Sequence, residues 1–451
     1  MLDFCRIKKV HFIGVGGVSL SSLALLMRKN NLAVSGSDRS FSDKLLLLEE
    51  HGCIVWVGTD ISKINNVDLV VFSSAIPPDN EELVFCKSIG IPCLERYIFL
   101  GEVSCLFDNT IAVAGTHGKT TVTGMLIHIM NKASLPFCGH IGGDIKDLGN
   151  FYYSGNSYFV TEACEYRKSL LALKPKIALV LNAENDHPDT YKNLTEIYDT
   201  FDSFFDNTSH LKITNGDTPY YKVRQRHNPV ITYGQNIDNE YVISNISEYK
   251  KGYFEFSISH LGIPKCTIKL GLAGKHNIFN AAACFVVCDL LGIDEQIVVK
   301  GLKDFGGVKR RFEHLGYFLG ASIIIDYAHH PSQIEVEINT ARSLMDKQSK
   351  LYVVFQPHTY SRTAKLFDEF CSCLTYCDEL IMCKEYSARE KPSDGISAIT
   401  LYEKIPHKNK YYYNNIMDIA THLAKKAQTK DIILILGAGD IDNLGSILTS
   451  N

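Results

Sequence analysis

The chain has 451 residues, of which 45% are hydrophobic and 21% are charged, and its formal net charge is −4. This length and balance are typical of a globular protein of about three domains and exclude a disordered or fibrous chain. The sequence has no Lys/Arg block that would bind nucleic acid and no apolar run long enough to cross a membrane. Its 14 cysteines lack the spacing of a zinc site, and they favour a protein of the reducing cytoplasm.

The first predicted block covers residues 1–107 and begins with a strand, a glycine turn, a helix and a second strand that ends at Asp38. This order is typical of a Rossmann-like half, in which ligands bind beyond the carboxyl ends of the strands. Gly14 and Gly16 only partly match the G-x-G-x-x-G pattern, because Ser19 stands at its third glycine. A later strand end carries Ser73, whose hydroxyl suits a diphosphate or a sugar. The block therefore fits either the dinucleotide of a dehydrogenase or a nucleotide-sugar diphosphate.

A second block, residues 108–308, opens with an apolar strand that runs directly into the loop GTHGKTT. A glycine turn at a helix start presents backbone N–H groups and the helix dipole to an anion, and Lys119 adds a point charge. The loop departs from the common G-x-x-x-x-G-K-[ST] pattern, because Val113 stands where that pattern has its first glycine. A chance helix cap is the alternative to a triphosphate site. The loop comprises Gly115, Thr116, His117, Gly118, Lys119, Thr120 and Thr121.

Two strand ends in the same block offer metal ligands. Glu162 closes the apolar strand of SYFVTEA, and His187 follows the strand of IALVLNAE. With the hydroxyl of Thr120 they could form a Mg²⁺ site, because magnesium takes oxygen ligands and usually a carboxylate. The alternatives are a solvated carboxylate for Glu162 and a capping or core histidine for His187.

Residues 215–275 are predicted to contain antiparallel strands, followed by a helix that begins near Lys275. Asn277 and Asn280 are three residues apart and share one helix face, where their amides could bind an adenine edge. A helix cap is the alternative for Asn277. Arg311 lies at the junction with a third α/β block, residues 309–451, where it could reach a transferred phosphoryl group or simply be a surface charge.

Together these motifs resemble the Mur ligase family over nearly the whole chain. In family order they are IGVGGVSLSSLA, SGSD, SSAIP, GTHGKTT, TEACEY, NAENDHPDTY, GKHNIFNAAA, VKRRF, IDYAHHPSQI and FQPHTYSRT. The resemblance implies three α/β domains. They would be a Rossmann-like domain for a UDP-sugar at 1–107, a central P-loop ATPase-like domain for ATP at 108–308, and a Rossmann-like domain for an amino acid at 309–451.

The activity that the resemblance implies is an ATP-dependent ligation in peptidoglycan precursor synthesis. L-Alanine would be joined to the lactyl carboxylate of UDP-N-acetylmuramate through an acyl phosphate, with ATP and Mg²⁺ as cofactors, in a cytoplasmic monomer or homodimer. Ligases for later amino acids carry a carbamylated lysine, which the segment TEIYDTFDSFF lacks. Three alternatives stay open: a ligase that recycles murein tripeptide onto the same nucleotide sugar, an NAD-dependent dehydrogenase, and a nucleotide-binding regulator without catalysis.

The resemblance also implies roles for individual residues. Lys119, Glu162, His187, Arg311 and His329 would be catalytic, with Thr120, Glu162 and His187 on magnesium and His329 as the candidate base for the alanine amine. ATP would be bound by the loop 115–121 together with Asn277, Asn280, Arg311 and Asp326. The candidates for binding the nucleotide sugar and alanine are Gly16, Ser19, Asp38, Ser73, Arg96, Tyr327, His329 and Arg362.

Two motifs depart from the family pattern. Thr359 stands in HTYSR where many relatives have arginine, which leaves Arg362 to carry more of the contact with the alanine carboxylate. EACEY replaces the more familiar EADES, which keeps Glu162 and leaves the role of Glu165 open.

Overall fold

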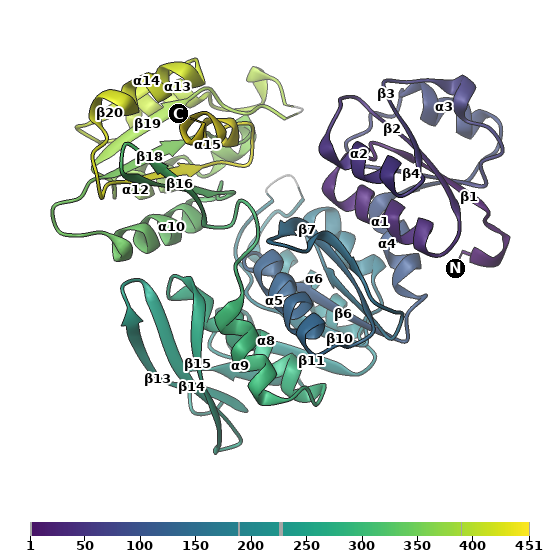
Figure 1. The fold of residues 1–451 in the computed structure, drawn as a ribbon, viewed down its shortest axis with the longest axis horizontal. Coiled ribbons are helices and arrows are strands. Elements are labelled where there is room, and N and C mark those ends of the chain that lie inside the picture. The colour runs from purple at the N-terminus through teal and green to yellow at the C-terminus, as the bar shows by residue number, and fades with distance from the viewer. Residues whose placement is uncertain (1, 188–189, 225–228, 389, 451) are drawn as a thin grey trace. The chain divides into compact units, whose positions relative to one another are not determined.

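The computed structural model of the chain describes residues 2–187, 190–224, 229–388 and 390–450. By its internal contacts it divides into two compact units. The first comprises Met1–Ala183, Ile197–Thr214 and Thr218–Ile231, and the second comprises Glu184–Glu196, Asn215–Asp217 and Thr232–Asn451. Pro188 and Asp189 of the motif NAENDHPDTY lie outside the described residues. Figure 1 shows the course of the chain, coloured from the N-terminus to the C-terminus.

The first sheet has the strand order β3-β2-β1-β4-β5, and its neighbours are parallel. Because the strand order reverses at β1, the glycine turn after β1 lies at the point where open α/β sheets bind ligands. Its elements are η1 (Phe4–Arg6), β1 (Lys9–Ile13), α1 (Val18–Lys29), β2 (Ala33–Asp38), α2 (Asp43–Glu50), β3 (Ile54–Val57), η2 (Ile61–Lys63), β4 (Leu69–Phe72), α3 (Glu81–Ser88), β5 (Cys93–Glu95) and α4 (Arg96–Ser104).

The second sheet contains the order β11-β10-β6-β9-β7-β8, parallel except for the antiparallel pair β7–β8. Strand β6 lies between β9 and β10, so the loop after β6 again opens at a reversal of strand order. The elements are β6 (Asn109–Ala114), α5 (Lys119–Lys132), β7 (Phe137–Ile145), β8 (Gly149–Tyr153), β9 (Tyr158–Glu162), η3 (Tyr166–Ala172), β10 (Ile177–Val180), α6 (Leu194–Asp206), β11 (Leu211–Asn215) and α7 (Pro219–Arg224).

A group of longer strands follows in the order β15-β14-β13-β12, and the pairs β13–β14 and β14–β15 are antiparallel. Figure 1 shows β13, β14 and β15 side by side. They confirm the antiparallel strands predicted within residues 215–275. The elements are β12 (Ile231–Gly234), β13 (Tyr241–Lys250), β14 (Tyr253–His260), β15 (Ile263–Ala273), α8 (His276–Leu290) and α9 (Glu295–Asp304).

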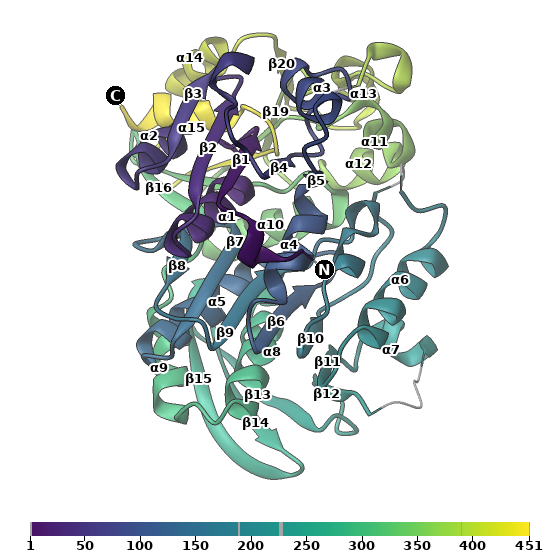
Figure 2. The same ribbon diagram turned by 90° about the vertical axis from the view of Figure 1, so that its right-hand side faces the viewer.

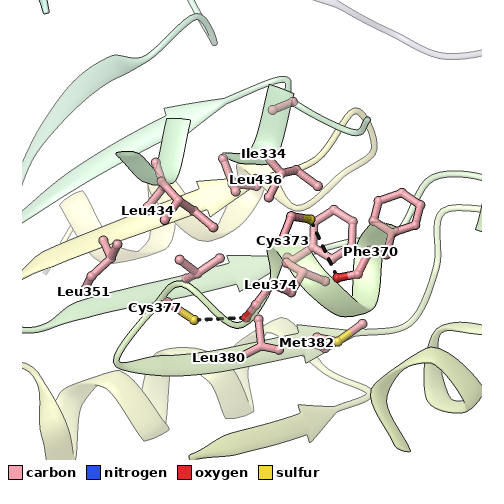
Figure 3. Packing of buried hydrophobic residues seen from close by; sticks show 14 of the residues in the cluster. Ile334, Leu351, Phe370, Cys373, Leu374, Cys377, Leu380, Met382, Leu434 and Leu436 are labelled. Atoms are coloured by element: carbon pink, nitrogen blue, oxygen red, sulfur yellow. Dashed lines mark hydrogen bonds between the residues drawn. The ribbon is translucent and has the colours of Figure 1, made fainter. Parts of the chain in front are cut away.

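The third sheet has the order β16-β17-β21-β18-β19-β20, parallel except for the antiparallel pair β16–β17. Apolar clusters cover both of its faces, because its central strands are buried on both sides. One cluster contains Leu351, Leu434 and Phe370 (Figure 3). The elements are β16 (Glu313–Phe318), β17 (Ala321–Asp326), α10 (Pro331–Leu344), β18 (Leu351–Phe355), α11 (Tyr360–Lys365), α12 (Phe367–Cys373), β19 (Glu379–Cys383), η4 (Pro392–Asp394), α13 (Ala398–Lys404), β20 (Lys410–Tyr413), α14 (Ile416–Lys426), β21 (Ile432–Leu436) and α15 (Asp442–Thr449).

The prediction of parallel α/β sheets is confirmed, since apolar runs that predict strands, such as SYFVTEA and IALVLNAE, form β9 and β10. Runs such as "TIAVAGT" and "DIILILGAG" correspond to the fully buried strands β6 and β21. Within the described part of the chain, no helix has the length and apolar character needed to cross a membrane.

Candidate active site

The phosphate loop joins β6 to α5 and depends on two glycines with positive φ. Gly115 has φ of 134° and Gly118, the residue that caps α5, has φ of 85°. A Cβ on Gly115 would lie 3.1 Å from the backbone nitrogen of Asn182, so a side chain there would be both strained and crowded. The Asn182 side chain braces the loop: it accepts from the His117 N–H at 2.8 Å and donates to the His117 carbonyl at 3.1 Å. The conformation of the loop is therefore fixed by its two glycines and by Asn182, which follows β10.

Lys119 is the first residue of α5, and its ammonium group is held by four oxygen atoms of three residues. It donates to the carbonyl oxygens of Gly115 at 2.5 Å and Thr116 at 3.2 Å, and to the two carboxylate oxygens of Glu165 at 2.9 and 3.1 Å. Burial disfavours the charge on Lys119, but the Glu165 carboxylate more than offsets it and raises the pKa of the lysine. Glu165, whose role the sequence left open, is thus the buried counterion of the loop lysine.

The hydroxyl of Thr120 and the carboxylate of Glu162 come together as the sequence predicted. Thr120 Oγ1 donates to Glu162 Oε2 at 3.0 Å, and the backbone N–H of Gly142 donates to Glu162 Oε1 at 2.6 Å. One hydroxyl and one oriented carboxylate at a helix start form the donor set that Mg²⁺ takes when it also binds phosphates and water. These two residues therefore fit a magnesium ion.

His187, the third predicted metal ligand, belongs to the second compact unit. It has a positive φ of 54°, its backbone N–H donates to Asp186 Oδ1 at 2.6 Å, and its Nε2 lies 3.7 Å from Asp186 Oδ2. Its assignment to magnesium stays a prediction. The Asp186 carboxylate thus lies beside the ring, an arrangement that orients metal-binding histidines in other proteins.

Asn277 and Asn280 lie buried on one face of α8. Asn277 Nδ2 donates to the Ala273 carbonyl at 2.7 Å, and Asn280 Nδ2 donates to Asn277 Oδ1 at 3.0 Å. The residue that caps α8 is Lys275, so the alternative of Asn277 as an N-cap is wrong. The two amides are fixed relative to each other, as a pair that reads a base edge must be, and their contact with adenine stays a prediction.

Around the end of β17, Arg311 lies over the ring of Tyr327, with its guanidinium carbon 5.2 Å from the ring centroid. Asp326 is buried and accepts from the backbone N–H groups of Phe312 at 2.7 Å and Ala328 at 2.6 Å. The carboxylate thereby fixes the segments before and after the strand. Arg311, Asp326 and Tyr327 therefore form one cluster. The sequence did not predict the contacts among them.

The candidates for the amino acid lie in the second unit, where Arg362 is buried and Tyr327 and His329 are half-buried. The carbonyl of Tyr327 lies 2.9 Å from His329 Nδ1, and because a carbonyl only accepts, Nδ1 carries the proton and Nε2 has the lone pair. Burial, followed by the charge of Arg362, lowers the pKa of His329 well below its usual value. His329 is therefore neutral near pH 7 and can accept a proton at Nε2.

Arg362 contacts a carboxylate that the sequence did not assign to it. Its Nη2 lies 3.4 Å from Asp186 Oδ1 and its Nη1 lies 3.2 Å from His358 Nδ1, while its Nε is buried without a hydrogen-bond partner among the described residues. Burial raises the pKa of Asp186, but His187 and Arg362 more than offset this and hold it well below its usual range. Asp186 belongs to the motif NAENDHPDTY, but no feature of the sequence indicates that it pairs with Arg362, 176 positions later.

In the first sheet, the Asp38 carboxylate accepts from the Gly16 N–H at 2.8 Å, and a Cβ on Gly16 would lie 2.9 Å from that carboxylate. Asp38 thus closes the glycine turn. Ser73 Oγ accepts from the Ala75 N–H at 3.1 Å at the end of β4. Arg96 Nη1 donates to Ser19 Oγ at 3.2 Å, which joins two of the predicted contacts to the nucleotide sugar.

Comparison with known proteins gives matches along the whole chain. Residues 9–108 match the model of the Mur ligase family catalytic domain, 113–288 the Mur ligase middle domain, and 310–439 the Mur ligase glutamate ligase domain. A UDP-N-acetylmuramate–L-alanine ligase of Lachnospira eligens is 38% identical, with 99% of each chain covered. The chain belongs to the Mur ligase family.

Other relatives of this Mur ligase agree. A UDP-N-acetylmuramate–L-alanine ligase of Clostridium acetobutylicum is also 38% identical, over 98% of each chain. The crystal structure of the UDP-N-acetylmuramate–alanine ligase of Thermotoga maritima superimposes with a TM-score of 0.84 at 26% identity, covering 98% of each chain. A murein peptide ligase of Psychrobacter arcticus shares the fold, with a TM-score of 0.75 at 22% identity and 98% of each chain covered.

The family membership confirms the resemblance seen in the sequence and the three-domain α/β fold. The protein is an ATP-dependent amide-forming ligase, so the dehydrogenase alternative for the glycine turn is wrong. Four residues of the site carry functions that sequence reasoning missed: Glu165, Asn182 and Asp186, which brace the candidate site residues, and His140, which bonds to Ser19.

Proposed function

We propose that this Mur ligase joins L-alanine to the lactyl carboxylate of UDP-N-acetylmuramate in the synthesis of the peptidoglycan precursor. The observation that supports this most strongly is 38% identity, over essentially the full length, to ligases that carry this name. The geometry of the phosphate loop fits it, since Lys119, Thr120 and Glu162 meet at a helix start. The domains would be residues 1–107 for the nucleotide sugar, 108–308 for ATP and 309–451 for alanine.

A carboxylate does not react with an amine until it is activated. In the proposed first step a lactyl carboxylate oxygen attacks the γ-phosphorus of ATP, the bond to the β–γ bridging oxygen breaks, and ADP leaves an acyl phosphate behind. Loop N–H groups and the Lys119 ammonium would stabilise the charge that spreads over the phosphoryl oxygens, together with Arg311. Thr120 and Glu162 would hold one Mg²⁺ and His187 a second, and these ions would supply further charge neutralisation.

In the second step the alanine amine attacks the acyl carbon, the carbon–oxygen bond to phosphate breaks, and the amide forms as phosphate leaves. The amine must lose a proton, and His329 can take it at Nε2 because its Nδ1 hydrogen already faces the Tyr327 carbonyl. Arg362 would bind the alanine carboxylate, with Asp186 and His358 fixing the guanidinium. Asn277, Asn280 and Asp326 would contact the nucleotide.

We further propose a cytoplasmic enzyme, monomeric or homodimeric, that binds neither nucleic acid nor membrane. A reducing compartment agrees with the cysteines, all 14 of which are free thiols. The ATP that the reaction consumes is a cytoplasmic metabolite.

Phosphate release tests the proposal. With ATP, Mg²⁺ and UDP-N-acetylmuramate present, release should depend on L-alanine and should not occur with murein tripeptide alone as the acceptor. Omitting either the nucleotide sugar or the amino acid should reduce release to background. Release with tripeptide but not with L-alanine would assign the protein to the recycling reaction, and ATP binding without release under any combination would make it a regulator.

A further inference from the structure

A buried histidine of the first unit joins two residues of the candidate nucleotide-sugar site to the strand that carries Glu162. His140 lies on β7 with 4% of its surface exposed. Its Nε2 is 2.9 Å from Ser19 Oγ, 121 positions earlier in the chain, and its Nδ1 is 2.9 Å from Thr161 Oγ1 on the neighbouring strand β9. Both ring nitrogens are therefore used, one on each side.

The two ends of this chain of hydrogen bonds fix its direction. At one end Arg96, which can only donate, gives a hydrogen bond to Ser19 Oγ at 3.2 Å. At the other end Thr161 Oγ1 donates to the backbone carbonyl of Glu162 at 3.2 Å, and a carbonyl can only accept. The Thr161 oxygen must then accept from His140 Nδ1–H, and the Ser19 hydroxyl must donate to the lone pair on Nε2.

The neutral imidazole with its proton on Nδ1 satisfies every member of the series. A proton on Nε2 would face the Ser19 oxygen, whose own hydrogen would lose its acceptor. Burial, and then the positive charge of Arg96, lower the pKa of His140 to about 3, in agreement with this neutral form. The directed series is therefore present near pH 7.

The surrounding contacts hold the same two segments together. Asn150 on β8 donates to the Val18 carbonyl at 2.6 Å and to Ser21 Oγ at 3.1 Å, both on α1 or its first turn. Lys44 of α2 donates to Asn150 Oδ1 at 2.7 Å and pairs with Asp144. Figure 2 shows α1 beside β7 and β8, and these elements are in contact. The β7–β8 hairpin thus fixes the start of α1 relative to β9.

Ser19 and Arg96 lie where a ligand of the first sheet is expected. Ser19 is in the first turn of the helix that follows β1, and Arg96 is the first residue of the helix that follows β5. Parallel strands have their carboxyl ends at one edge, and β1 is where the strand order reverses. Glu162 ends β9 at the corresponding edge of the second sheet, beside the phosphate loop.

We propose that His140 is a positioning residue, which holds Ser19 and Arg96 in the orientation that binds the nucleotide sugar and keeps that site in register with the strand end at Glu162. The proposal rests on the function proposed above. Its physical basis is that the transferred phosphoryl group and the lactyl carboxylate must meet within about 3–3.5 Å, so an error in the relative position of the two sites costs rate as well as affinity.

The test measures binding without turnover. The dissociation constants of UDP-N-acetylmuramate and of ADP are determined separately by calorimetry for the wild type and for His140→Ala. The variant should bind the nucleotide sugar at least about tenfold more weakly, because two polar groups lose their partner, while its affinity for ADP stays within about twofold. Cys138→Ala is the matched control: Cys138 is fully buried two residues earlier on the same strand, without a place in the series, and should leave both affinities unchanged.

Thr161→Val provides a second variant in case His140→Ala does not fold, because it replaces the hydroxyl with a methyl group and keeps the β-branched shape. It should weaken nucleotide-sugar binding about threefold in the same direction. Wild-type affinity in both variants would overturn the proposal, as would an equal loss of both ligands, which a purely structural role produces. If the wild type itself does not bind UDP-N-acetylmuramate, the proposed function fails, which is a distinguishable result.

Discussion

Glu165 shows how a residue outside the predicted site can decide the state of one within it. The side chain of Glu165 is only 3% exposed and that of its partner Lys119 only 15%, so this ion pair is shielded from water. In the sequence, Glu165 lies in a motif that departs from the family pattern, and its role could not be predicted. Its pairing with a lysine 46 positions earlier depends on the close approach of β6 and β9. A buried pair of this kind is costly to break on one side.

We expect Glu165→Gln to lower the free energy of unfolding by about 2–4 kcal/mol, because it leaves the buried ammonium without a counterion. Urea denaturation at pH 7 measures the change. Glu255→Gln is the control, since it removes a half-exposed pair with Lys269 at 3.3 Å and should cost about 0.5 kcal/mol or less. Equal losses in the two variants would show that the Lys119–Glu165 pair behaves as a surface contact.

At the scale of single elements, the strands were predictable and their partners were not. Runs such as SYFVTEA and SIIIDYA form strands because apolar residues on both faces are typical of strands buried inside a sheet. The end of the first of these strands then brings Glu162 to Thr120. The contacts of Ser19 with His140 and of Asp186 with Arg362 join segments more than 100 residues apart. No periodicity or motif encodes such pairings, so sequence reasoning missed them.

Strand β7 carries a prediction about pH. The pKa of His140 is lowered to about 3 in the folded protein, from the usual histidine value of 6.5. Between these values the unfolded chain binds a proton that the folded chain excludes, so stability is lost as the pH falls below 6.5. From pH 7 to pH 5 this residue should lower the free energy of unfolding by up to about 2 kcal/mol.

Urea denaturation at pH 7 and pH 5 checks this expectation. His140→Gln, which does not titrate, should lose about 2 kcal/mol less than the wild type over this interval, because the slope with pH reflects the difference in bound protons. His51→Gln serves as the control, because His51 is exposed and caps the C-terminal end of α2. Its loss of stability over this interval should match that of the wild type. If the free energy of unfolding of His140→Gln decreased between pH 7 and pH 5 as much as that of the wild type, His140 would not be held neutral by the fold.

At the scale of the whole molecule, the order of motifs identified the family and its three α/β domains. Most of these motifs fall at the carboxyl end of a strand, where such sheets bind ligands, whereas VKRRF lies just before β16. The domain boundaries at residues 107 and 308 stay predictions. Segments 184–196 and 215–217 group with the later part of the chain by their contacts, although they follow strands of the second sheet. Such a grouping follows from long-range packing, which a linear pattern does not contain.

The central claim is that a glycine loop and its lysine bind a polyphosphate so that a carboxylate becomes reactive toward an amine. The most direct measurement is the rate of formation of the UDP-N-acetylmuramoyl-alanine amide by mass spectrometry, in the wild type, in Lys119→Ala and in Lys132→Ala, an exposed position at the other end of α5. We predict a rate about 10³-fold below the wild type for Lys119→Ala and an unchanged rate for Lys132→Ala. Product formation within threefold of the wild type in folded Lys119→Ala would contradict the account.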